Sequence, residues 1–232
     1  MNEPLVLLPG MMCDARLFQP QTEALSSSYP LVVMPLIGRD SIEALARDIL
    51  NNAPRRFALL GLSMGGIVAM EMIRQAPDRI SRLALLDTNP MADAADRKDI
   101  REHQIERVEA GELETIMRDE MKPNYLADGD SGNDILELCM LMAKALGPEV
   151  FIQQSRALKT RYDQCETLKK VQVPTLIACG EHDLLCPFEK HQLMHKLIAK
   201  SKLFMIAGAG HLPTLEQAEL TNQQIRQWLQ AP

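Results

Sequence analysis

The sequence predicts an α/β protein: a mostly parallel sheet of about six strands flanked by helices, with a helical lid inserted after the fourth strand. Short apolar runs alternate with helical patterns up to about residue 90, and again from residue 166. The runs are continuously apolar, as expected when helices cover both faces of a parallel sheet. Residues 91–165 carry helical patterns and no convincing strand. We therefore assign 1–90 and 166–232 to the core and 91–165 to the lid.

The first half of the core is predicted to hold four strands. The strands are 4–8, 31–34, 57–60 and 82–87, and the helices are 17–27, 42–51 and 64–75. Ser41 is placed to cap the second helix, because its side chain can accept a hydrogen bond from the first turn. Pro77 ends the third, since proline has no N–H to continue the helical ladder. Parallel strands joined in this way imply right-handed crossovers.

The same patterns predict the elements of the lid and of the second half of the core. The predicted lid contains a helix over 96–119, a polar loop over 123–134, and helices over 135–146 and 148–162. The alternation resumes with strands 174–179 and 202–206 and helices 188–199 and 214–230. Open α/β sheets bind ligands at the carboxyl ends of their strands. An insertion that leaves from such an end is therefore expected to cover a site.

Composition excludes several classes of partner. The formal net charge of −6 disfavours nucleic acid, because no basic surplus exists to neutralise phosphates. No apolar stretch approaches a membrane span, and the amino-terminal residues lack the pattern of a signal peptide, so a cytoplasmic protein is expected. The five cysteines show no CxxC pair, so no metal, cofactor or disulfide framework is expected. The sequence leaves a monomer and a homodimer open.

Gly61-Leu62-Ser63-Met64-Gly65 fits the pattern G-x-S-x-G between a predicted strand and a predicted helix. A sharp strand-to-helix turn strains the residue at its apex, and side chains at either flank would clash. The two glycines remove those side chains, so the turn can raise the Ser63 hydroxyl above the sheet. A turn that serves only close packing remains an alternative.

A serine needs a base and an orienting acid to act as a nucleophile. His211 follows the last strand in AGAGHLPTLEQ and is the best candidate base, reached through the flexible Gly208 and Gly210. Asp183 follows the strand over 174–179 and is the preferred acid, and Asp87 is its rival. Ser63, Asp183 and His211 then occur in the chain order expected for this kind of sheet.

The other histidines are expected to lie on the surface or to play no part. His103 lies among charged residues of the lid. His191 and His195 are four residues apart on one helix, which could make a metal pair but more simply marks a solvated helix face.

Acyl transfer also needs two fixed N–H donors for the oxyanion. The amide of Met64, directly after the serine, is one expected donor. The loop PGMMCD after the first strand should supply the other, with Met11 first and Met12 second, and Gly10 would let this backbone approach closely.

These residues resemble the α/β-hydrolase superfamily over nearly the whole chain. The matching pieces are LLPGMM, GLSMGG, LLDTNP, PTLIACGEHDLLCP and GAGHLPTLEQ. The resemblance implies that Ser63 is the nucleophile, His211 the base, Asp183 the acid, and Met11 and Met64 the oxyanion donors. There are two departures from the family pattern. Pro9 stands where the family usually has histidine, and the usual amino-terminal antiparallel hairpin is missing.

The resemblance is to small, lidded, carboxylesterase-like members, so we expect hydrolysis of a small to medium apolar ester. The candidate substrate contacts are Met12, Met117, Met121, Leu138, Met142 and Phe151. No arginine cluster is evident that would anchor an anion, although Arg156 and Arg161 are candidates. Three alternatives stay open: a C–C bond hydrolase, lyase or lactonase; a cofactor-free perhydrolase; and a non-catalytic signalling member that binds a small molecule.

Overall fold

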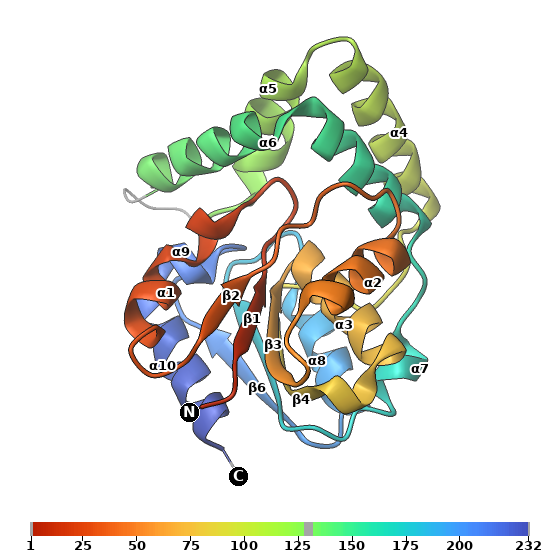
Figure 1. Cartoon of the computed structure of the whole chain (residues 1–232). Helices are drawn as coiled ribbons and strands as arrows, with labels where there is room; N and C mark the ends of the chain where they lie inside the picture. The colour runs from red at the N-terminus through yellow and green to blue at the C-terminus, as the bar shows by residue number, and fades with distance from the viewer. Residues whose placement is uncertain (1, 128–131, 232) are drawn as a thin grey trace.

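The computed structural model describes residues 2–127 and 132–231. Within that part of the chain, six strands form one sheet in the order β2-β1-β3-β4-β5-β6, and every neighbouring pair is parallel (Figure 1). The strands are β1 (Leu5–Leu8), β2 (Leu31–Val33), β3 (Phe57–Leu62), β4 (Ile80–Leu86), β5 (Thr175–Gly180) and β6 (Ser201–Ile206). The predicted parallel α/β sheet is confirmed.

Helices cover both faces of the sheet. The helices α1 (Gln19–Leu25) and α10 (Ala218–Gln230) lie on one face, and α2 (Ile42–Asn52), α3 (Met64–Gln75) and α8 (Phe188–Leu197) lie on the other (Figure 1). Alternate strand residues therefore enter two different cores. Leu5 and Leu7 pack with Trp228, whereas Val6 and Leu8 pack with residues of α2 and α3. This two-sided burial is why the strand sequences are continuously apolar.

Most predicted boundaries hold within two residues. The helix predicted over 64–75 has those bounds, and Ser41 Oγ accepts a hydrogen bond from the N–H of Ala44 at 3.3 Å, which caps α2. The predicted helix over 17–27 begins as a 3₁₀ turn, η1 (Ala15–Phe18), and the last one divides into α9 (Pro213–Glu216) and α10.

Between β4 and β5 the described chain is helical. Its elements are α4 (Ala95–Glu109), α5 (Leu113–Thr115), the π-helical turn η3 (Ile116–Met121), η4 (Lys122–Asn124), α6 (Gly132–Thr160) and α7 (Cys165–Leu168). The single helix predicted over 96–119 is wrong, because Gly111 takes a φ of +94° and interrupts it. The two helices predicted over 135–162 meet at a kink, where Gly147 has a φ of 81°. The polar loop predicted over 123–134 includes 128–131, which lie outside the described residues.

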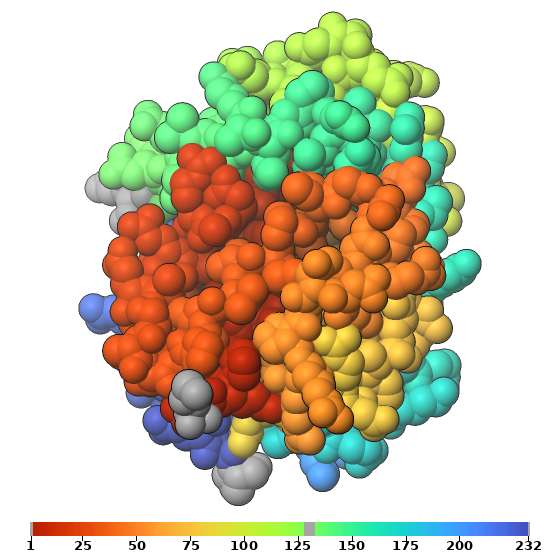
Figure 2. All heavy atoms as spheres, in the orientation of Figure 1, coloured from red at the N-terminus to blue at the C-terminus, as the bar shows by residue number. Residues whose placement is uncertain are grey.

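We call α4 to α6 the helical insertion. It is stacked over one end of the sheet, and α7 packs beside α3 and α8 (Figure 1). In the space-filling view the green and teal insertion rests on the red and orange segments near the amino terminus (Figure 2). The N–H of Gly38 donates to Gln153 Oε1 of α6 at 3.0 Å across this boundary. A helix long and apolar enough to cross a membrane does not occur in the described chain.

Candidate active site

Ser63 occupies the turn between β3 and α3 in a strained backbone conformation. Its φ is 54° and its ψ is −115°, a combination that costs free energy for any residue with a side chain. The flanking glycines make the turn possible. A Cβ at Gly65 would lie 2.0 Å from the carbonyl oxygen of Leu8, and one at Gly61 would lie 2.2 Å from that of Gly65. Close packing therefore requires glycine at both positions, as the pattern predicts.

The structure brings Ser63, Asp183 and His211 together at the carboxyl ends of three strands. His211 Nε2 lies 2.9 Å from Ser63 Oγ, and His211 Nδ1 lies 2.9 Å from Asp183 Oδ2. With its proton on Nδ1, the imidazole donates to the carboxylate and accepts from the serine hydroxyl. This is the geometry needed to take a proton from Ser63.

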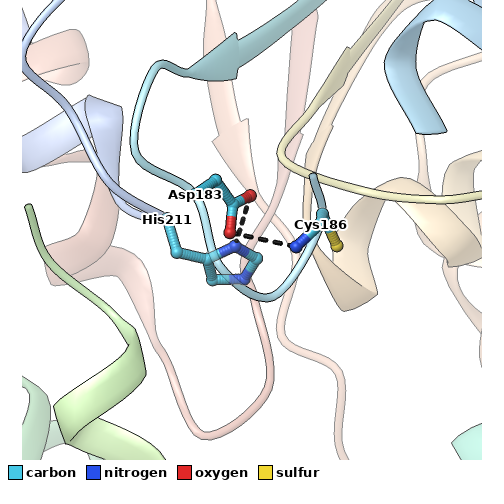
Figure 3. A group of neighbouring side chains, drawn as sticks. All are labelled: Asp183, Cys186 and His211. Carbon is cyan, nitrogen blue, oxygen red and sulfur yellow. Dashed lines mark hydrogen bonds and ion pairs between the residues drawn. The ribbon is translucent and has the colours of Figure 1, made fainter. Parts of the chain in front are cut away.

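Asp183 is held as a buried carboxylate. Its Oδ1 accepts hydrogen bonds from the N–H groups of Leu185, at 2.8 Å, and Cys186, at 3.0 Å. Figure 3 shows the bond from Cys186. Burial acts to raise the pKa of this carboxyl, but His211 and the two backbone donors outweigh it and lower the pKa to about 2. The group therefore stays charged and can stabilise a positive imidazole.

The same loops place Cys186 beside the pair, so a metal site must be considered. Potential ligand atoms of Asp183, Cys186 and His211 lie within 4.8 Å of one another (Figure 3). Burial, and then the charge of Asp183, raises the pKa of the Cys186 thiol well above its usual value. A neutral thiol is a poor metal ligand, because the thiolate is the binding form. Asp183 and His211 are already hydrogen-bonded to each other, and His211 also to Ser63, so the geometry is that of an acid–base pair.

The glycines near His211 serve close packing and turns. A Cβ at Gly180 would lie 1.8 Å from the carbonyl oxygen of Gly210, and one at Gly210 would lie 2.6 Å from the N–H nitrogen of Ala127. Gly208 has a φ of 68°. We predicted a flexible segment before His211, but the structure shows that this segment is tightly packed. The N–H of His211 also donates to the Tyr125 carbonyl at 2.7 Å.

Asp87, the rival acid, is buried next to Asp183. Its Oδ1 accepts from the N–H of Gly180 at 2.8 Å, and Oδ2 has no partner among the described residues. Burial and the neighbouring charge of Asp183 raise the pKa of Asp87 well above its usual value. Burial and the Asp183 charge thus favour the neutral form of Asp87, and the structure pairs His211 with Asp183.

His191 is fully buried, so the prediction of a solvated helix face is wrong at this position. Its Nε2 accepts a hydrogen bond from the N–H of Thr88 at 3.2 Å, and burial lowers its pKa to about 4. His195 is exposed, with Nδ1 2.8 Å from Ser201 Oγ, so the two histidines do not share a site. His103 is exposed, as expected.

In the loop after β1, the backbone N–H of Met12 is hydrogen-bonded, whereas that of Met11 has no partner among the described residues. The N–H of Met12 donates to Gln154 Oε1 at 2.8 Å, so Met12 is not available to an oxyanion. Among described residues, no hydrogen bond uses the N–H of Met11 or Met64, and both residues line the cavity beside Ser63. Gly10 is not required sterically, since a Cβ there would make an ordinary 3.5 Å contact with Ser63 Cβ. Sequence reasoning missed Gln154, although it interrupts an otherwise apolar helix face.

A cavity of about 340 Å³ lies between the sheet end and the helical insertion, and it is lined by Ser63 and His211. Of the six predicted substrate contacts, only Met121 lines it among described residues. The other five pack in the two hydrophobic cores: Met12, Met117, Leu138, Met142 and Phe151. The prediction fails for these five, because the insertion needs much of its apolar surface to dock on the body of the protein.

Several charged side chains line the cavity, and the sequence indicated only one of the arginines among them, Arg161. Arg101 Nε lies 2.6 Å from Asp93 Oδ2, and Arg161 Nη2 lies 2.9 Å from Asp93 Oδ1. Arg97 lines the same space. The expectation of an apolar pocket without an arginine cluster is therefore wrong. Arg156, the other candidate, pairs with Glu109 and does not line the cavity.

This chain is similar in sequence and in fold to several known hydrolases. The profile of the Alpha/beta hydrolase family matches residues 5–224. The pimeloyl-[acyl-carrier protein] methyl ester esterase of Vibrio cholerae is 25% identical, covering 97% of this chain and 93% of that protein. A thermophilic esterase from Thermogutta terrifontis superposes with a TM-score of 0.90 at 29% identity, covering 99% of this chain and 90% of that one. The enol-lactonase of Burkholderia xenovorans LB400 shares the fold, with a TM-score of 0.89 at 20% identity, covering 100% and 93%.

Proposed function

The chain belongs to the Alpha/beta hydrolase family, and from that premise we propose that it is a serine hydrolase that cleaves small to medium carboxylic esters. The observation that carries the proposal is the continuous hydrogen-bonded line from Ser63 Oγ through His211 to Asp183. The esterases among the similar proteins support an ester as the substrate class.

The first half-reaction forms an acyl-enzyme. His211 Nε2 accepts the hydroxyl proton of Ser63 as Oγ attacks the ester carbonyl carbon. The N–H groups of Met11 and Met64 bind the resulting oxyanion, and one such donor is typically worth about 3 kcal/mol of transition-state stabilisation. The charged Asp183 stabilises the imidazolium. The alcohol then leaves with the proton that His211 returns to it.

The second half-reaction releases the acid. Water enters the position left by the alcohol, and His211 takes its proton as the water attacks the acyl carbon. The same two amides bind the second oxyanion. Collapse of this intermediate breaks the bond to Ser63 Oγ, which recovers its proton from His211, so the enzyme returns to its starting state.

We assign residues 1–90 and 166–232 to the catalytic core and 91–165 to a lid. The lining of the cavity supports this division, because Ser63 and His211 come from the core and Arg101 and Met121 from the insertion. In this arrangement the core supplies the chemistry and the lid supplies most contacts that distinguish one ester from another.

The test is hydrolysis of p-nitrophenyl acetate and labelling with a fluorophosphonate probe. Ser63→Ala should lower the rate by several orders of magnitude and abolish labelling, because the nucleophile is lost. Ser27→Ala, at an exposed position far from the turn, is the matched control. A Ser63→Ala protein as active as the wild type would refute the proposal. A folded wild type that turns over no ester would point to the non-catalytic binding alternative.

A further inference from the structure

One wall of the cavity is strongly basic. The helix α4 presents Arg97 and Arg101, four residues apart and therefore on one face. Arg161, just after α6, and Lys190, on α8, complete the wall. Three separate elements bring these cations to the space in front of Ser63.

Acidic groups do not balance this charge. Arg101 and Arg161 share the single carboxylate of Asp93, whose side chain is 5% exposed, so one positive charge of this trio is uncompensated. Arg97 and Lys190 form no ion pair with described residues. The other acid in the lining, Glu120, is engaged by Arg107 from outside the cavity and by Gln104 Nε2 at 3.0 Å. A buried excess of positive charge is costly unless an anion joins it.

We propose that this wall binds a carboxylate carried by the substrate, so that the enzyme prefers esters with a second, free carboxylate. The inference rests on the proposed function. A guanidinium presents a planar fork of N–H donors that matches a carboxylate in two parallel hydrogen bonds. A phosphate is the poorer fit, because its second negative charge would face Asp93.

The position of the wall sets the distance between the two ends of the substrate. Arg101 Nη1 lies 4.0 Å from Met11 Sδ, and the amide of Met11 is the proposed oxyanion donor. The cation is thus about one methionine side chain away from the reacting carbonyl. Half-esters of short dicarboxylic acids span that separation, and a long acyl chain is not needed.

The experiment compares monomethyl with dimethyl esters of succinate, glutarate and adipate. The wild type should show a higher kcat/KM per ester bond for at least one monomethyl ester. Arg97→Gln and Arg101→Gln should each lower the ratio of monoester to diester kcat/KM by about tenfold, the factor ordinarily lost with one charge-assisted hydrogen bond. Arg97 is exposed and makes no hydrogen bond with described residues, so its variant should fold normally.

A variant that raises the monoester to diester ratio distinguishes a carboxylate-binding role of the wall from a purely structural one. Asp93→Asn removes the competing carboxylate and should raise the monoester to diester ratio, which mere damage to the cavity would not do. Arg156→Gln, on the surface of α6, should leave both rates unchanged. Glutarate should inhibit p-nitrophenyl acetate hydrolysis competitively and more strongly than inorganic phosphate.

Several outcomes would overturn the inference. One is a wild type that hydrolyses p-nitrophenyl acetate but treats monoester and diester alike, which would leave the proposed function intact. Another is that Arg97→Gln and Arg101→Gln lower kcat/KM by the same factor for the monoester and the diester. Stronger inhibition by phosphate than by glutarate would reassign the wall to a phosphorylated ligand. Loss of all ester activity in the wild type would instead refute the proposed function.

Discussion

The backbone N–H of Met12 donates a hydrogen bond of 2.8 Å to the side-chain oxygen of Gln154, 142 residues further along the chain. The amide nitrogen of Gln154 donates in turn to the carbonyl of Leu36 at 2.8 Å. Gln154 is 1% exposed, so both bonds are buried. One side chain of α6 thereby ties the helical insertion to the loops after β1 and β2. The neighbouring N–H of Met11 donates to no residue that the structure describes.

Gln154→Ala should therefore impair both stability and catalysis. The change leaves the N–H of Met12 and the carbonyl of Leu36 buried without partners, which costs about 1–3 kcal/mol per group. It also frees the loop that positions the N–H of Met11, so kcat should fall more than tenfold. Urea unfolding and ester kinetics measure the two effects. Arg156→Ala, two residues further along α6 and exposed, is the control. An unchanged kcat in Gln154→Ala would show that the loop holds its position without this clamp.

The two neighbouring aspartates should respond very differently to the same substitution. Asp183→Asn removes the charge that stabilises the imidazolium and disturbs the His211 tautomer, so kcat should fall by a factor of the order of 10⁴. Asp87→Asn should change kcat less than tenfold. The raised pKa of Asp87 favours its neutral form, which asparagine resembles in charge. Asn can still accept the Gly180 N–H, and Asn tolerates the φ of 44° at this position.

Steady-state kinetics of both variants on one ester measure this difference. If Asp87→Asn were the inactive variant and Asp183→Asn the active one, the rival acid would be the functional partner of His211.

His191 should make the folded state sensitive to mild acid. Its pKa is about 4 in the folded protein, whereas the ordinary value, which applies to the unfolded chain, is 6.5. Between pH 6.5 and about 4, His191 is therefore protonated in the unfolded state but not in the folded state. Stability is thus fully present above pH 6.5 and falls as the pH drops towards about 4, by roughly 3 kcal/mol in total. Asp183 contributes only at lower pH, because its pKa moves from 3.8 to about 2.

The measurement is the free energy of unfolding in urea at about pH 7 and about pH 4.5, for the wild type and His191→Gln. Glutamine can still accept the N–H of Thr88 but does not titrate, so the variant should lose less stability between the two pH values. Equal losses in both proteins would place the acid sensitivity at another group.

Gly65→Ala should prevent folding or destabilise the protein severely. Its Cβ would lie 2.0 Å from the carbonyl oxygen of Leu8, so β1 and α3 would have to separate. Gly38→Ala is the matched control. Gly38 has a φ of +77° and no atom within 4 Å of the added Cβ, so only the backbone strain of about 1–2 kcal/mol applies. Thermal unfolding of the two variants tests the difference, and comparable melting temperatures would contradict a steric role for Gly65.

The sequence by itself determined the parallel α/β architecture, the turn at Ser63 and the candidates His211 and Asp183. These features depend on short-range patterns: apolar runs that mark buried strands, glycines that mark tight turns, and polar residues directly after strand ends. In a parallel sheet the strand ends lie at one edge, so residues distant in sequence can be expected to meet there. The same reliance on local patterns also limited the prediction, since Gly111 interrupts a helix that apolar periodicity alone would continue.

Only the tertiary structure decided which residues face the cavity. An apolar periodicity marks the buried side of a helix but does not say what buries it, so Met117 and Phe151 were expected in the pocket and lie in the core. Long-range contacts created the basic wall, because Arg101 and Arg161 meet only where α4 and the end of α6 come together around Asp93. The two buried hydrogen bonds of Gln154, to Met12 and Leu36, also depend on long-range contacts. Such relationships depend on how the helical insertion docks, and docking is a property of whole surfaces, which no short stretch of sequence specifies.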